Sequence, residues 1–378
     1  MNIMEHDFTP VIKEILVKYF GDKAEDLFDK SSLLQYINIK TISATRGSKA
    51  RSSFANLYAI YVLVEDYIKH GFHKNGEYSK YKGAQFSTLF KRQRQLPFGK
   101  KLQNHALNNR LNEEFHKFFP QIDAQPILRV IETKRYWINE NLLLPTLGKK
   151  KFNIAPSIVE IINKYSHTKQ ASFEKFIQTC EKLRYISKQR ADKVEDFIVG
   201  LLAPNVDARI FEIVSYAILK YFYHDQTVYF GFQLDEIEKS PLILYKTGRT
   251  NANDGGIDFV MKPIGRFFQV TETLDVRKYF LDIDKIERYP ITFVIKSSES
   301  VEALTRKLKE GAERQYSVIA IVEKYMKCVE EVINIPILQE RFRIGIKQGY
   351  LGKIMDEIVR QSKVEFNYEE IIKEHKEE

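Results

Sequence analysis

Four side chains with oxygen or hydroxyl groups stand at one end of a predicted β-hairpin within residues 246–273. Asp258 opens the first strand, and Gln269, Thr271 and Glu272 end the second. The runs IDFVM and RFFQVTE have strand-like patterns and flank the turn KPIG, which is typical of a hairpin. Because the hairpin brings its two open ends together, we expect these groups to meet where a divalent metal could bind.

Another carboxylate, Glu212, lies upstream in the first half of a strongly apolar segment, residues 209–222. This segment is predicted to be a buried helix, with Asn205 or Asp207 as its N-cap. An isolated charge on a buried helix is costly. Glu212 is therefore either a further metal ligand or a partly exposed side chain paired with Arg209.

The elements around this hairpin alternate between strands and helices. Four further runs are predicted to be strands: residues 227–232, 242–245, 291–295 and 318–322. Residues 274–288 are predicted to form a helix or an irregular crossover, and residues 301–314 and 351–360 helices. This order predicts an α/β fold with a central mixed sheet after residue 204.

The N-terminal half is predicted to be mainly helical. Residues 8–29 and 54–68 have apolar residues at helical spacing, and helices continue through residues 111–200, with Trp137 in the core. The run GKKK at residues 148–151 is predicted to be a loop and a possible domain boundary.

Positive charge is concentrated in that half. Residues 1–200 carry 33 Lys and Arg against 21 Asp and Glu, whereas the remainder carries 26 against 29. Residues 31–110 alone hold 14 basic and 3 acidic residues. Such a region indicates a polyanionic partner, either nucleic acid or an anionic membrane surface, although a merely soluble basic surface is the alternative.

Basic, amide and aromatic side chains alternate through this stretch. Arg, Lys and Asn are the residues that hold phosphates and read guanine and adenine edges. Our candidate DNA-contacting residues there are Arg46, Lys49, Arg51, Lys91, Arg92, Arg94, Lys100 and Lys101. Arg249, Asn251 and Asn253, before Asp258, either contact DNA or form a turn. The interleaved aromatic residues either stack on bases or belong to the core: Tyr78, Tyr81, Phe86, Phe90 and Phe98.

Several classes of protein are excluded by composition. The sequence has no run of 18 apolar residues, which argues against a membrane span, and its first residues lack the pattern of a secretion signal. Cys180 and Cys328 are the only cysteines, so a disulfide scaffold and a four-cysteine zinc site are excluded. A reducing cytoplasm fits this cysteine usage.

The residues DGGID at 254–258, followed by Gln269 and preceded by a buried helix with an early glutamate, resemble the PD-(D/E)XK nuclease superfamily, most of all its Mrr-type branch. With its basic N-terminal part, the whole chain is similar to type II restriction endonucleases, with the ApaLI-like and HaeII-like groups as candidate placements. The resemblance is specific over residues 205–296 and rests on charge and segment order upstream.

The resemblance implies a Mg²⁺-dependent, sequence-specific endonuclease that cuts double-stranded DNA to 5′-phosphate ends as a homodimer. Its role would be restriction of foreign DNA in a prokaryotic cytoplasm, with a cognate DNA methyltransferase as functional partner. Asp258, Gln269 and Glu212 would be metal ligands, with Thr271 and Glu272 completing the catalytic group. The alternatives are a modification-dependent or repair nuclease, or a non-catalytic DNA-binding protein with a decayed nuclease fold.

The family pattern has a lysine where this chain has Thr271, two residues after Gln269. A lysine from elsewhere could replace it, and Lys246, Lys262 and Lys278 are candidates. The implied organisation has three parts: a basic, helical DNA-binding region at residues 1–150, a helical connector at 151–203 and a PD-(D/E)XK-like catalytic domain at 204–378.

Overall fold

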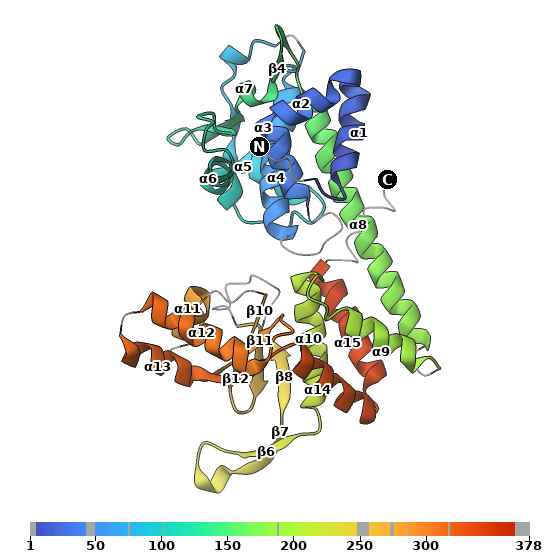
Figure 1. Ribbon diagram of the computed structural model, residues 1–378, viewed down its shortest axis with the longest axis vertical. Helices are drawn as coiled ribbons and strands as arrows, with labels where there is room; N and C mark the ends of the chain where they lie inside the picture. Colours follow the sequence, from blue (N-terminus) through green and yellow to red (C-terminus); the bar gives the residue numbers. More distant parts are fainter. Residues whose placement is uncertain are drawn as a thin grey trace. The chain divides into compact units, whose positions relative to one another are not determined.

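The computed structural model describes residues 5–42, 50–74, 76–100, 102–186, 189–247, 257–272, 276–286, 288–316 and 318–366. The chain divides into two compact units, Met1–Lys175 (unit 1) and Phe176–Glu378 (unit 2). The division falls inside the long helix α8 (Ala155–Ile186), which Figure 1 shows in green.

Unit 1 is mainly helical, and its core contains helix α4 (Ala50–Lys69), where Leu57, Ile60 and Val64 are fully buried. The prediction of a core helix at residues 54–68 is therefore confirmed. The other helices of unit 1 are α1 (Thr9–Phe20), α2 (Ala24–Lys30), α3 (Ser32–Thr41), α5 (Phe86–Gln95), α6 (Leu111–Phe118), α7 (Glu140–Leu143) and the start of α8.

Unit 1 also contains strands that the helical prediction for residues 111–200 missed. Residues in the runs ILRV and RYWI form an antiparallel hairpin, on which Trp137 is only half-buried, so its assignment to the core was wrong. Short alternating runs on either side of a turn favour a hairpin over a helix. The strands of unit 1 are β1 (Ala84–Gln85), β2 (Ile127–Val130), β3 (Arg135–Ile138), β4 (Thr146–Leu147) and β5 (Lys150–Lys151).

Unit 2 contains a five-stranded mixed sheet in the order β12-β11-β10-β9-β8, which confirms the predicted central mixed sheet. Strands β8 to β10 form an antiparallel meander, and β11 and β12 continue in parallel with β10. The strands are β8 (Ile243–Lys246), β9 (Phe259–Lys262), β10 (Arg266–Thr271), β11 (Ile291–Ile295) and β12 (Val329–Ile333).

Helices cover both faces of this sheet (Figure 1). On one face Tyr216 of α10 packs against Phe259, and on the other Tyr279 of α11 packs against Phe293. The first layer comprises α9 (Ala191–Gly200), α10 (Ala208–Phe222), α14 (Ile335–Lys347) and α15 (Leu351–Phe366), and the second α11 (Val276–Lys285), α12 (Val301–Gln315) and α13 (Ile319–Cys328). Consecutive residues of β10 can consequently both be buried.

Two strand predictions in unit 2 need correction. Residues 318–322 do not form a strand, because α13 begins at Ile319 and buries Val322 and Tyr325 at helical spacing. The parallel strand is β12 instead. Strand β6 (Thr227–Phe230) does exist, but it pairs with β7 (Glu238–Pro241) in a separate hairpin and not with the central sheet.

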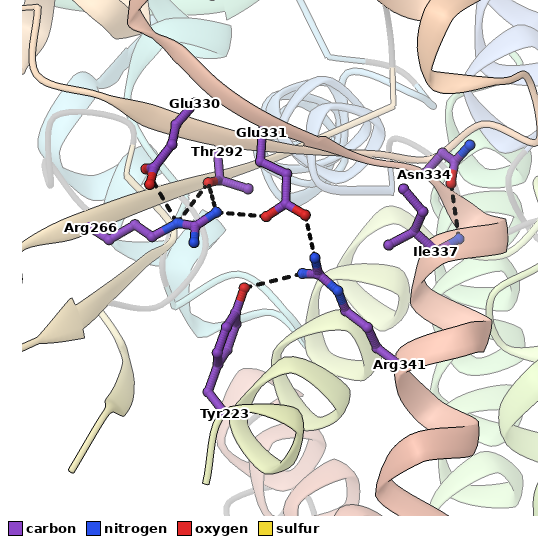
Figure 2. Close-up of polar contacts among 8 residues, drawn as sticks. All are labelled: Tyr223, Arg266, Thr292, Glu330, Glu331, Asn334, Ile337 and Arg341. Atoms are coloured by element: carbon purple, nitrogen blue, oxygen red, sulfur yellow. Dashed lines mark hydrogen bonds and ion pairs between the residues drawn. The ribbon is translucent and has the colours of Figure 1, made fainter. Parts of the chain in front are cut away.

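Figure 2 shows a polar network that joins six side chains of unit 2: Tyr223, Arg266, Thr292, Glu330, Glu331 and Arg341. At its centre, the Glu331 carboxylate lies 2.6 Å from Nη2 of Arg266 and also accepts a hydrogen bond from Arg341. Arg266 begins β10, Glu331 belongs to β12 and Arg341 belongs to α14. The Glu331 carboxylate therefore connects β10 and β12, the two strands on either side of β11, to helix α14 on one face of the sheet.

We expect Glu331→Gln to lower the free energy of unfolding by about 3 kcal/mol, because it leaves two largely buried guanidinium groups without their shared anion. Urea unfolding monitored by circular dichroism measures this change. The matched control is Glu310→Gln on α12, since Glu310 also pairs with two arginines, Arg306 and Arg314, but in solvent. The free energy of unfolding of Glu310→Gln should fall by less than about 1 kcal/mol. Equal losses in the two variants would contradict the central role of Glu331.

Candidate active site

The candidate site lies where β9 begins and β10 ends. Asp258, the residue before β9, forms hydrogen bonds with β10 through both its main chain and its side chain. Its N–H donates to the Phe268 carbonyl at 3.0 Å, and its Oδ2 accepts the Val270 N–H at 2.7 Å. The carboxylate is therefore held at a set position on the neighbouring strand.

Gln269 of β10 also contacts Val270, and it is only 6% exposed. Its Nε2 lies 3.4 Å from the Val270 carbonyl, while its Oε1 is buried and, within the described ranges, accepts no hydrogen bond. A buried amide oxygen without a partner is uncommon, because its desolvation is uncompensated. The side chains of Asp258 and Gln269 thus both contact the main chain of Val270, and they offer a carboxylate and an amide oxygen that lacks a hydrogen bond.

This pair fits a hard divalent cation such as Mg²⁺. Mg²⁺ takes oxygen ligands, keeps several waters and needs only one or two carboxylates from the protein. Among the residues that the structure describes, His, Cys, Asp and Glu side chains form no cluster of three or more at metal-binding spacing. Asp258 and Gln269 are the oxygen donors that this chain would offer at the end of β10.

Thr271 is buried at the end of β10 and cannot supply the positive charge that a lysine would. It lies opposite Ile295 in the parallel register, and its carbonyl accepts the Lys296 N–H at 2.9 Å. Tyr279 of α11 is buried on this side of the sheet, where its ring contacts Phe293. Burial raises the pKa of Tyr279, so the phenol keeps its proton at neutral pH.

Lys296 brings a cation to this end of the sheet. It follows β11 directly, its side chain is 2% exposed, and its Nζ lies 2.7 Å from the Glu272 carboxylate. The same Nζ donates to the carbonyl of Val206, just before α10. Sequence reasoning missed Lys296, although a lysine directly after a buried strand parallel to β10 was a usable signal.

Glu212 also pairs with a lysine. Its carboxylate accepts a hydrogen bond from Nζ of Lys246, and both side chains are almost wholly buried. Arg209, the partner considered from the sequence, instead pairs with Asp207 at 3.0 Å, and Asp207 caps α10 by accepting the Arg209 N–H. Glu212 is therefore a buried, charge-neutralised carboxylate and not a partly exposed one.

The predicted catalytic residues fall into three small groups. Asp258 and Gln269 both contact the main chain of Val270. Glu272 forms an ion pair with Lys296, and Glu212 forms an ion pair with Lys246. Lys246 lies opposite Phe259 in the sheet register, on the face covered by α10, whereas Thr271, three residues after Phe268, lies on the other face. The fold thus brings the groups to the same end of the sheet but onto different faces.

The remaining lysine candidates differ in position. Lys262 ends β9 and lies 5.1 Å from the centre of the Tyr245 ring, at the opposite end of the strand from Asp258. Lys246 is the partner of Glu212, and the side chain of Lys278 lies outside the described residues. Lys296 is therefore the lysine that the structure places beside the end of β10.

In unit 1, Lys91, Arg94 and Lys100 are exposed, whereas Arg92 pairs with Glu65 at 2.8 Å. The aromatic residues of this stretch belong to the core: Tyr78, Phe86, Phe90 and Phe98 pack against it, and Tyr81 contacts Phe72. The other DNA-contact candidates, or their side chains, lie outside the described residues: Arg46, Lys49, Arg51, Lys101, Arg249, Asn251 and Asn253.

Comparisons with protein-family models, curated proteins and solved structures find no match to this chain. Within the described ranges, no helix has the length and apolar character needed to cross a membrane.

We expect Gln269→Leu to leave the free energy of unfolding of the metal-free protein unchanged or to raise it by about 1 kcal/mol, because it removes an unsatisfied buried oxygen. Thermal unfolding with and without Mg²⁺ measures this effect. Wild-type protein should gain thermal stability with Mg²⁺, since a bound ligand stabilises the folded state, and the variant should lose that gain.

The matched control for this variant is Gln93→Leu in unit 1, which also removes a buried amide oxygen without a described partner. It should keep the Mg²⁺-dependent gain. The metal assignment is wrong if Gln269→Leu keeps the full gain as well.

Proposed function

We propose that this protein is a Mg²⁺-dependent endonuclease that hydrolyses phosphodiester bonds of double-stranded DNA and leaves 5′-phosphate ends. The observation that carries the proposal is the Asp258–Gln269 pair, with its unsatisfied Gln269 oxygen. An oxygen-only donor pair suits Mg²⁺ and, through it, a phosphate substrate.

Each residue near the site has a distinct part in the proposed reaction. Asp258 and Gln269 would hold the cation, which when bound would make a water nucleophilic and stabilise charge on the phosphate. Val270 keeps both donors in place through its N–H and its carbonyl. Thr271, buried at the end of β10, completes the wall of the site without adding charge.

Lys296 takes the part that the family pattern gives to a lysine at Thr271. Its ammonium has three N–H donors, and the structure assigns two acceptors, Glu272 and the Val206 carbonyl. The third would reach the attacking water or a phosphate oxygen from the α10 side of the sheet, where Nζ of Lys296 lies 5.9 Å from the centre of the Phe211 ring. Glu272 orients the ammonium, and Glu212 with Lys246 supports the neighbouring strand from α10.

The biological role that we propose is restriction of foreign DNA by cutting at a specific sequence. Support comes from the basic excess of residues 31–110 and from the exposed Lys91, Arg94 and Lys100, which suit phosphate contacts. Cutting both strands of a palindrome calls for two sites related by a two-fold axis, hence a homodimer. A cognate methyltransferase would protect host DNA.

Asp258→Asn tests the metal site. We expect plasmid cleavage in Mg²⁺ to fall by at least about 100-fold, because the variant loses the carboxylate ligand, while DNA affinity measured without divalent metal stays unchanged. Asp196→Asn, an exposed aspartate on α9, is the control and should cleave normally. Cleavage retained in Asp258→Asn would show that Asp258 is not a ligand of the catalytic metal.

The wild-type substrate profile separates the proposed role from its alternatives. Discrete fragments from unmethylated plasmid support restriction, whereas cleavage of methylated plasmid alone indicates a modification-dependent enzyme. DNA binding without Mg²⁺-dependent cleavage indicates a decayed nuclease.

Lys296→Met tests the replacement lysine. We expect kcat to fall by about 100-fold while the Mg²⁺-dependent gain in thermal stability remains, because the lysine is not a metal ligand. Lys296→Arg, which keeps a cation next to Glu272, should recover part of the rate. Lys262→Met serves as control, since Lys262 is at the other end of β9. An unaltered kcat in a folded Lys296→Met protein excludes Lys296 from the reaction.

A further inference from the structure

One hairpin of unit 2 exposes large apolar side chains. Residues 227–241, here called the arm, contain β6 and β7 and project away from the central sheet in Figure 1. Phe232 is 92% and Leu234 91% exposed, and Tyr229 and Ile237 are exposed as well. Single exposed apolar residues are ordinary, but a contiguous group on a projecting element marks an interaction surface.

The arm has little support of its own. Its sheet contains only β6 and β7, so each strand has one flank that no other described strand covers. An isolated two-stranded hairpin is at best marginally stable in water, and open edges are templates for pairing. A partner that covers the apolar side chains would therefore stabilise the arm.

The charge of the arm decides the kind of partner. Asp235, Glu236 and Glu238 are exposed around the apolar side chains, against a single lysine, Lys239. Carboxylates repel phosphate, so DNA does not fit the arm. Exposed apolar side chains interspersed with carboxylates suit a basic protein surface. The basic excess of this chain is concentrated in residues 31–110, which hold 14 basic and 3 acidic residues.

We propose that the arm docks onto exposed lysines of unit 1 in a second copy of this chain, among them Lys69, Lys74 and Lys82, which the proposed DNA contacts leave unused. Two reciprocal contacts of this kind would close a two-fold dimer. The inference deepens the proposed function, because it names the contact that would pair two cutting sites. It needs neither metal nor DNA to be tested.

Sedimentation velocity of the full chain at micromolar concentration, without Mg²⁺ or DNA, tests the proposal. We expect the wild type to be a dimer at low salt. The double variant Phe232→Ser with Leu234→Ser should be monomeric, because it removes the apolar centre of the contact. Tyr185→Ser is the control, since Tyr185 is 85% exposed but lies on α8, and it should remain dimeric.

Charge provides a second measurement. The double variant Glu236→Lys with Glu238→Lys should dissociate, whereas Glu310→Lys on α12 should not. Salt should weaken the wild-type dimer, because the Debye length falls to about 3 Å at 1 M. Two arms paired with each other would bring carboxylates together, and salt would then strengthen the dimer.

Three results would overturn the proposal: a monomeric wild type, a dimer that survives the Phe232 and Leu234 substitutions, or a dimer that salt strengthens. The proposed function fails separately, through Mg²⁺-dependent cleavage that persists in Asp258→Asn. A folded monomeric arm variant that still nicks one DNA strand keeps the nuclease and shows that the arm serves assembly.

Discussion

In unit 2, β10 and β11 run in parallel from Phe267 opposite Ile291 to Thr271 opposite Ile295. Parallel strands end at the same edge of a sheet, so this register sets which side chains meet there. It brings Lys296 to the end of β10, where the Lys296 N–H donates to the Thr271 carbonyl. At the other end of the same strands, the Glu331 network joins β10, β12 and α14 (Figure 2).

Burial on both faces of the sheet limits which charges the site can hold. Both glutamates near the site pair with a lysine: the half-buried Glu272 pairs with Lys296, and the buried Glu212 pairs with Lys246. Such pairing is expected, because an isolated buried charge is very costly. Gln269 supplies an oxygen donor without a charge, so it can stay buried without a cation. Its unsatisfied oxygen is the remaining cost, and a bound metal ion would remove it.

The arm follows a different rule from the rest of unit 2. The central sheet buries apolar residues on both faces, whereas the arm exposes Tyr229 of β6 and three apolar residues of the loop that follows it, Phe232, Leu234 and Ile237. Exposed carboxylates beside them keep the arm soluble and disfavour pairing between two arms, which is a usual way to protect open strand edges. The same carboxylates are what would select a basic partner.

Local patterns in the sequence determined the hairpin of β9 and β10, the buried helix that carries Glu212, the core helix α4 and the concentration of basic charge. These features depend on residues a few positions apart, so periodicity and turn residues suffice to predict them. Tertiary structure alone decided that Glu212 pairs with Lys246, that Lys296 stands beside Thr271, and that residues 318–322 join a helix while β6 leaves the sheet. Those outcomes depend on strand order, register and covering helices, which bring together residues far apart in sequence and which no local pattern encodes.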